Sequence, residues 1–167
     1  LDTTANKLTE KISALAIKAY LLKTYQPTPG NNFSTGLVAD YGVDANAYAL
    51  YCTVANYYTA KNQKDSALFM LNHLLKAYNN RLPFTLNKYL VGAAMMDAGR
   101  QQDGVRVAME FIEEMLQLHK KPVTHYPYIS RKMVLNTAIE IQWLFERHHA
   151  DRTRIDEIVK MMNKDWY

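Results

Sequence analysis

Apolar residues recur at helical spacing along most of the chain, and polar breaks divide this pattern into segments of ordinary helix length. Over residues 4–24, apolar side chains share one face while lysines occupy the opposite face. No segment alternates strictly enough between apolar and polar residues to predict a strand. The expected fold is all-α, with seven helices. We place them at 4–24, 45–60, 64–79, 85–98, 102–119, 129–149 and 152–164.

Two of the expected helix pairs share one layout. The first pair breaks at Asn62 and the second at Gly99, so the equivalent turns are 99 − 62 = 37 residues apart. A spacing in the mid-thirties with two helices per unit is typical of solenoids built from stacked hairpins. We therefore expect a single domain in which residues 45–167 form about three stacked antiparallel helical hairpins, preceded by a lid helix.

Residues 25–44 interrupt the helical pattern with two prolines and three glycines. We expect an irregular loop here, and a loop of this length within a compact domain is often functional. The loop contains embedded apolar side chains, and the chain ends in two aromatic residues. Because aromatic residues are enriched at binding hot spots, we expect these residues to contact a partner. The predicted partner-binding residues are Phe33, Leu37, Tyr41, Trp166 and Tyr167.

Composition agrees with one ordered helical domain of 167 residues, with 49% hydrophobic and 22% charged residues. The single cysteine, Cys52, excludes an internal disulfide framework, and its apolar neighbours favour a buried thiol. No apolar run is long enough to cross a bilayer, so membrane insertion is not expected. The sequence begins at Leu1 and not at Met, which either removal of a leader or an arbitrarily chosen boundary would explain.

Candidate catalytic and metal-binding groups are poorly placed for chemistry. His148 and His149 are adjacent, so on a helix they point about 100° apart. The pairs Glu113-Glu114 and Asp156-Glu157 are also consecutive on helices, where neighbours do not face each other as a catalytic dyad must. Phosphate-binding, dinucleotide-binding and nucleophile-elbow motifs do not occur. We expect no catalytic residue, cofactor or metal, and a role that is not enzymatic.

Twelve tyrosines are an unusual number for a chain of this length. A tyrosine buries its ring while its hydroxyl seeks a partner, which suits both the seams between helices and binding interfaces. The sequence does not distinguish these two roles. Methionines such as Met95-Met96 are also frequent, and at helical spacing they are typical of core positions.

Several short motifs sit at corresponding places in the expected units. The second unit carries a turn motif, an aromatic residue and acidic residues in its second helix, and a Lys-Pro exit: Ala98-Gly99-Arg100, Phe111, Glu113-Glu114-Met115 and Lys121-Pro122. With these motifs, residues 45–164 resemble pentatricopeptide repeats (PPR). The first unit has Asn62-Gln63 where the family has Gly. The third unit is degenerate, although Ala150-Asp151-Arg152 is similar to the turn. The resemblance implies a short PPR/TPR-like α-solenoid.

The resemblance also implies a location and partners. A short, basic chain with these units is similar to the small PPR-type extra subunits of the catalytic head of euglenozoan mitochondrial ATP synthases. It implies a mitochondrial accessory subunit on the matrix side that docks on protein subunits of a larger complex, with the ATP synthase alpha subunit as the partner. A component of a mitochondrial ribosome, or of another organellar assembly, would produce the same signals.

Single-stranded RNA is the alternative partner, because PPR proteins read one base per repeat with a few side chains. At the corresponding places of this chain, the resemblance implies Thr53 and Asn87 as readers of bases. Among the basic residues available for phosphate contact, Lys88 and Arg131 are the expected RNA contacts. A net charge of +4 permits phosphate contact. However, the basic residues are scattered among acidic ones, and two or three repeats read few bases. The sequence leaves both partners open.

Overall fold

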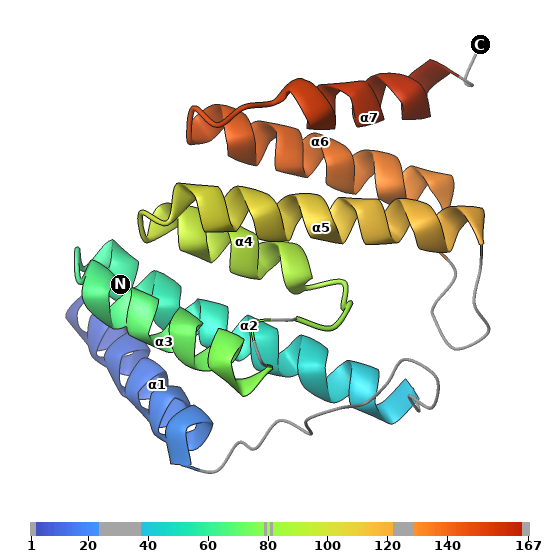
Figure 1. Ribbon diagram of the computed structural model, residues 1–167. Helices are drawn as coiled ribbons and strands as arrows, with labels where there is room; N and C mark the ends of the chain where they lie inside the picture. The colour runs from blue at the N-terminus through green and yellow to red at the C-terminus, as the bar shows by residue number, and fades with distance from the viewer. Residues whose placement is uncertain (1–2, 24–37, 79, 81, 122–128, 165–167) are drawn as a thin grey trace.

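A computed structural model shows a chain built from helices alone over the residues it describes, which are 3–23, 38–78, 80, 82–121 and 129–164 (Figure 1). Side chains are described in these ranges except at 3–10, at 12 and at 38–45. The helices are α1 (Thr3–Lys23), α2 (Val38–Ala60), α3 (Lys64–Ala77), α4 (Lys88–Asp97), α5 (Gln101–Lys120), α6 (Arg131–Arg147) and α7 (Thr153–Asn163). The expected all-α fold with seven helices is confirmed.

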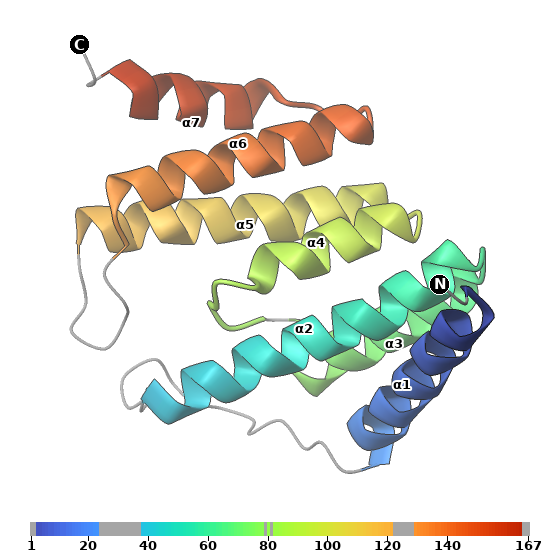
Figure 2. The same cartoon turned by 180° about the vertical axis from the view of Figure 1, so that it is seen from behind.

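The helices pair as antiparallel hairpins, which pile up in chain order. Helix α2 packs on α3, α4 on α5, and α6 on α7. The first and second hairpins meet where α2 packs on α4, and the second and third meet where α5 packs on α6. Helix α1 packs on α2 at one end of the stack. Figure 1 shows α3 and α5 in front of α2 and α4, and Figure 2 shows the reverse side, on which α2 and α4 face the viewer. This is the expected stack of hairpins.

The turn within each hairpin has the same backbone geometry. Asn62, Gly99 and His149 adopt the left-handed region, with φ of 58°, 95° and 52°. In each turn the residue after the left-handed one donates its N–H to the carbonyl five residues earlier. The three donors are Gln63, Arg100 and Ala150, at 2.9, 2.8 and 2.8 Å. This Schellman arrangement satisfies the last carbonyls of a helix. The equivalence of the Asn62 and Gly99 turns, predicted from their spacing, is therefore confirmed.

Apolar side chains form two buried clusters that meet at α4 and α5. One cluster joins α1, α2 and α3 to one side of α4, and includes Tyr51, Met70 and Met95. The other joins α5, α6 and α7, and includes Met96 and Phe145. Neighbouring residues of α4 thus belong to different clusters. The core is a row of interfaces between successive hairpins, as expected when each hairpin buries its apolar face on the next.

Two helix boundaries differ from the prediction by more than two residues. Helix α2 begins at Val38 and not at residue 45, so the predicted loop at 25–44 is wrong from Val38 onward. Gly42 had suggested a loop, but a glycine inside a helix costs only about 1 kcal/mol relative to alanine, which packing can offset. Helix α4 begins at Lys88 and not at residue 85. Thr85 instead lies in the preceding turn, where its hydroxyl accepts a hydrogen bond from the Asn87 N–H.

Candidate interaction surface

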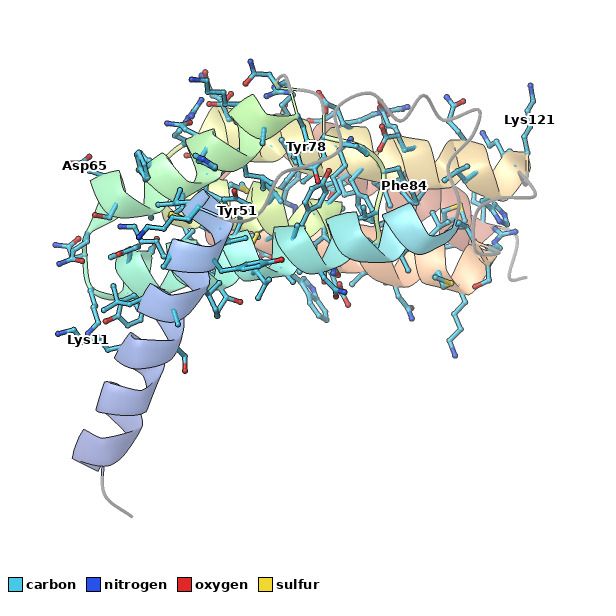
Figure 3. The ribbon with its side chains drawn as sticks, turned by 90° about the horizontal axis from the view of Figure 1, so that it is seen from below. Lys11, Tyr51, Asp65, Tyr78, Phe84 and Lys121 are labelled. Atoms are coloured by element: carbon cyan, nitrogen blue, oxygen red, sulfur yellow. The ribbon has the colours of Figure 1, made fainter. Side chains whose placement is uncertain are left out.

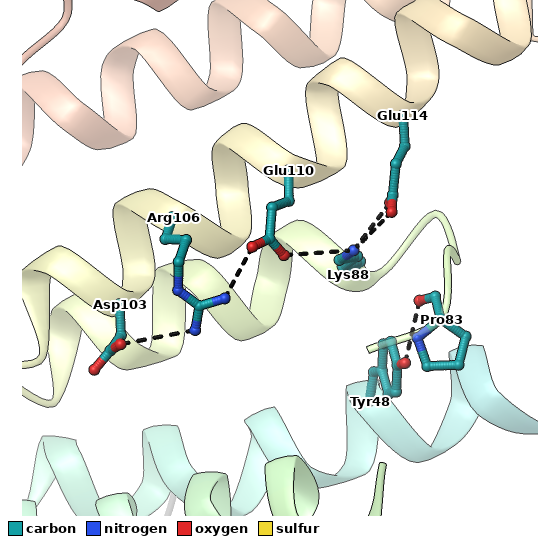
Figure 4. Close-up of polar contacts among 7 residues, drawn as sticks. All are labelled: Tyr48, Pro83, Lys88, Asp103, Arg106, Glu110 and Glu114. Carbon is teal, nitrogen blue, oxygen red and sulfur yellow. Dashed lines mark hydrogen bonds and ion pairs between the residues drawn. The ribbon is translucent and has the colours of Figure 1, made fainter. Parts of the chain in front are cut away.

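Lys88, a predicted RNA contact, lies inside the α4–α5 hairpin. Its side chain is 2% exposed, and its ammonium group contacts Glu114 of α5 at 2.9 Å and Glu110 at 3.9 Å (Figure 4). Burial raises the pKa of Glu114, while the hydrogen bond and charge of Lys88 act in the opposite direction. Both carboxylates hold the ammonium group at the helix interface. This burial argues against a contact between Lys88 and a nucleic-acid phosphate.

The network around Lys88 continues along α5. Glu110 also accepts a hydrogen bond from Arg106 at 2.9 Å, and Arg106 lies 3.7 Å from Asp103 (Figure 4). The equivalent position of the first hairpin is Tyr51, because 62 − 51 and 99 − 88 both equal 11. Tyr51 Oη forms a hydrogen bond of 2.8 Å with His73 Nδ1 of α3. Equivalent places in the two hairpins therefore carry polar contacts that join the two helices.

The other predicted RNA contacts are distributed over different parts of the stack. Thr53 is exposed on α2, and its hydroxyl donates to the Ala49 carbonyl of the same helix. Asn87 is half-buried at the start of α4. Arg131 donates two hydrogen bonds, of 3.2 and 2.7 Å, to the Met162 carbonyl near the end of α7. Arg131 thus satisfies a carbonyl at a helix C-terminus, which is a structural role.

Arginine side chains in the described part of the chain are bonded to acidic groups or carbonyls of the protein itself. Arg147 bonds Asp97 at 3.0 Å, for example, and Arg154 bonds Glu157 at 3.1 Å. The remaining described arginines, each with such a contact, are Arg100, Arg106, Arg131 and Arg152. The described arginines are therefore interleaved with acidic groups and carbonyls of the protein itself.

The predicted partner-binding residues fall largely outside the described part of the chain. Phe33, Leu37, Trp166 and Tyr167 lie outside the described residues. Tyr41 lies within α2, but its side chain is also outside the described set. Their contact with a partner stays a prediction, with one change: Tyr41 belongs to a helix and not to a loop.

Trp143 is the large apolar side chain that the structure leaves most exposed among the described residues. It lies on α6 and is 64% exposed, whereas Ile141 and Phe145 of the same helix are buried. Such exposure is unusual for tryptophan, the largest apolar side chain. Tryptophan is also the residue type most enriched at binding hot spots. Trp143 therefore marks a candidate interaction surface.

Trp143 belongs to a row that crosses all three hairpins. Counting back from the left-handed residue of each turn, Asn56, Ala93 and Trp143 hold one position, because 62 − 56, 99 − 93 and 149 − 143 all equal 6. Asn56 and Trp143 are exposed, and Ala93 between them is half-buried. These residues lie on the first helix of each hairpin. We call the surface formed by this row, together with Thr53 and Glu140, the first-helix face.

Side-chain contacts hold the first helices of the second and third hairpins together. Asp97 at the end of α4 accepts hydrogen bonds from Arg147 at 3.0 Å and His148 at 2.9 Å. Glu140 forms a hydrogen bond with Tyr89 of α4, and the pKa of Tyr89 is raised chiefly by burial and further by this carboxylate. These contacts join α4 to α6, and α2 packs on α4, so the first helices of the three hairpins are linked in chain order.

Trp143 was not among the residues that the sequence predicted to bind a partner. The signal that identifies its exposure is the periodicity of α6, whose apolar stripe runs through Val134, Ala138, Ile141 and Phe145. A residue two positions after Ile141 points about 200° away from that stripe. The helical period of α6 could therefore have predicted that Trp143 is exposed.

The groups that suggested chemistry are engaged in structural contacts. Glu113 bonds Arg154 of α7 at 3.5 Å while Glu114 bonds Lys88 of α4, so these neighbours face different helices. His148 donates a hydrogen bond of 2.9 Å to Asp97 of α4. In the described part of the chain, no three His, Cys, Asp or Glu side chains gather as a metal site would require. Nor does any described helix have the length and apolar character to cross a bilayer.

Comparisons of the chain with models of known families, with curated proteins and with solved structures give no match.

Proposed function

We propose that this protein is a non-catalytic accessory subunit that docks on a partner protein through the first-helix face. The observation that carries the proposal is Trp143, which is 64% exposed on a surface that three hairpins share. A solenoid presents an extended surface of this kind to its partners. A buried aromatic anchor with polar residues around it is the usual composition of a protein–protein interface. Here Asn56, Thr53 and Glu140 would supply the polar surroundings.

The identity of the complex rests on the resemblance to PPR subunits. We propose a mitochondrial complex, with the alpha subunit of the ATP synthase catalytic head as the partner. The motifs at Ala98-Gly99-Arg100 and Lys121-Pro122 support this proposal.

Purification of the tagged chain from mitochondria of its source organism tests this function. We expect the ATP synthase alpha subunit to be retained in a fixed ratio to the chain. Trp143→Ala should weaken this retention by about tenfold or more, since truncating a hot spot costs above ~1.4 kcal/mol. Phe69→Ala is the matched control, because Phe69 is an exposed aromatic residue (53%) on α3, away from the first-helix face. Retention of ribosomal proteins alone, or equal retention by both variants, would contradict the proposal.

RNA binding remains the second candidate only through the family resemblance. The burial of Lys88 and the bonding of Arg131 to the Met162 carbonyl count against it. If RNA is the partner, single strands should bind at low salt, and their affinity should fall steeply as salt rises. Gel retardation of single-stranded RNA by the purified chain measures this directly, and we expect no retardation.

A further inference from the structure

Helix α1 closes one end of the stack and carries apolar side chains on both of its sides. Ala14 and Leu21 are buried toward α2, where the Tyr51 hydroxyl donates to the Leu21 carbonyl at 3.5 Å. The opposite side exposes Leu15 (46%) and Tyr20 (49%) together with two alanines. Positions i, i+1, i+4 and i+5 of a helix share one face. We call this face, formed by Leu15, Ala16, Ala19 and Tyr20, the α1 outer face.

The two ends of the stack differ in polarity. At the other end, all but one of the exposed residues of α7 are polar or charged, the exception being Met161. The polar and charged ones are Thr153, Arg154, Glu157, Lys160 and Asn163. Terminal units of a solenoid need a polar outer side, because no further unit covers them. Helix α7 meets this requirement and α1 does not. Figure 3 views the stack from the α1 end, with α1 in front of α2 and α3.

Lysines border the α1 outer face. Lys11 and Lys23 are exposed at its two ends, and the described side chains of α1 include no acidic residue. Lys18 is engaged with the neighbouring helices: it donates to the Tyr58 hydroxyl of α2 at 3.1 Å and lies 6.0 Å from the centre of the Phe69 ring of α3. The face therefore combines an apolar centre with positive charge at each end. From Lys11 to Lys23 it extends about 18 Å, or three turns of helix.

From this combination we infer that the α1 outer face binds an amphipathic helix of a partner protein, with acidic residues flanking the apolar side of that helix. Leu15 and Tyr20 would pack beside its apolar residues, and the small Ala16 and Ala19 would let the two helices approach closely. Acidic residues at its ends would pair with Lys11 and Lys23. A second copy of this chain fits less well. In a two-fold contact between antiparallel helices, Lys11 of one copy would face Lys23 of the other.

This contact is separate from the first-helix face, so it holds whether or not Trp143 binds a partner. A library of displayed helical peptides, selected on the wild-type chain, tests it. Peptides that also bind the Leu15→Glu/Tyr20→Glu double variant are removed by counter-selection. We expect the remaining peptides to carry apolar residues at helical spacing with Asp or Glu beside them.

The selected peptide is then titrated by fluorescence polarisation. We expect about tenfold weaker binding to the double variant, because both central contacts are lost. The Lys11→Glu/Lys23→Glu variant should prefer a version of the peptide with lysine in place of its acidic residues. Trp143→Ala, a change on the other surface, should leave the affinity unchanged. Leu15→Ser/Tyr20→Ser serves as a second variant, with circular dichroism to check that each variant keeps its helices.

Three outcomes would overturn the inference. One is that no peptide survives the counter-selection. Another is that peptides with acidic and with basic flanks bind the wild-type chain equally well. The third is that light scattering shows a dimer of the wild-type chain that the Leu15→Glu/Tyr20→Glu variant loses. That result would mean that a second copy covers the α1 outer face.

Discussion

A lysine side chain that is 2% exposed needs a compensating charge for its ammonium group, and Lys88 receives that charge from Glu114 of α5. Glu114, its partner, is 39% exposed, so the two members of the pair depend on each other unequally. If Glu114 loses its charge, the Lys88 ammonium group stays buried between α4 and α5, where water cannot hydrate it. A carboxylate left alone at Glu114 can still be hydrated. The two members of the pair should therefore respond differently to substitution.

We predict that Glu114→Gln lowers the free energy of unfolding by about 3 kcal/mol, because it leaves a buried charge with only the more distant Glu110. Lys88→Met should cost about 1 kcal/mol or less, since it replaces the charge with an apolar side chain of similar length. Glu113→Gln is the control: its partner Arg154 is an exposed residue, so its effect should stay within about 0.5 kcal/mol. Urea unfolding measures all three, and equal costs for Glu114→Gln and Lys88→Met would refute the predicted asymmetry.

Cys52 gives a prediction about pH and reactivity. Burial raises the pKa of its thiol from 9.0 to about 12. At pH 8 the reactive thiolate should therefore be about a thousandfold scarcer in the folded chain than in the unfolded chain. Because the folded pKa is the higher one, the associated stability is present below pH 9 and is lost as the pH rises toward 12. Alkylation by iodoacetamide at pH 8, with and without urea, measures this, and rapid labelling of the folded chain would contradict it.

Among the elements, the hairpin turns depend most directly on residue type. Gly99 has φ of 95° and Asn62, at the equivalent place, has φ of 58°. The left-handed region costs an ordinary residue about 1–2 kcal/mol, while asparagine enters it readily. We predict that Gly99→Val lowers the stability of the chain by at least about 1 kcal/mol and that Gly99→Asn costs much less. Asn62→Gly should be neutral or stabilising. Thermal unfolding of the three variants checks this, and an equal loss for Gly99→Val and Gly99→Asn would rule it out.

Features governed by local chemistry were the ones that the sequence predicted well. The turns at Asn62 and Gly99 follow from backbone preference. Features that depend on packing between helices were missed. Gly92 and Gly104, for example, bring α4 and α5 together so closely that a Cβ on Gly92 would lie 2.8 Å from the Gly104 carbonyl oxygen. The positions of Gly92 and Gly104 in the sequence do not indicate that the two residues face each other.

In the candidate site, too, local features could be predicted from the sequence and contacts between helices could not. The helical period of α6 is local, so it could have identified the exposure of Trp143. The burial of Lys88 arises from the position of Glu114 on another helix, and the sequence shows only two charged residues far apart. The early start of α2 at Val38 was missed because Gly42 suggested a loop, although a glycine inside a helix costs only about 1 kcal/mol.

The whole molecule is a row of hairpins with two apolar clusters that meet at α4 and α5. In such a row each hairpin contacts only its neighbours, so stability is shared locally and not evenly over the chain. Val54 and Val134 offer a matched pair to test this. Both are fully buried valines on the first helix of a hairpin, but Val54 belongs to the cluster with α3 and Val134 to the cluster with α7.

We predict that Val54→Ala and Val134→Ala each remove about 2 kcal/mol of stability, but in different parts of the stack. Val54→Ala should speed amide hydrogen exchange mainly in α1, α2 and α3, and Val134→Ala mainly in α6 and α7. Hydrogen exchange followed by mass spectrometry of peptic fragments resolves the two regions. Helices α4 and α5 contribute to both clusters, so they should respond to both changes. If each variant instead speeds exchange by the same factor along the whole chain, the two clusters unfold as one cooperative unit.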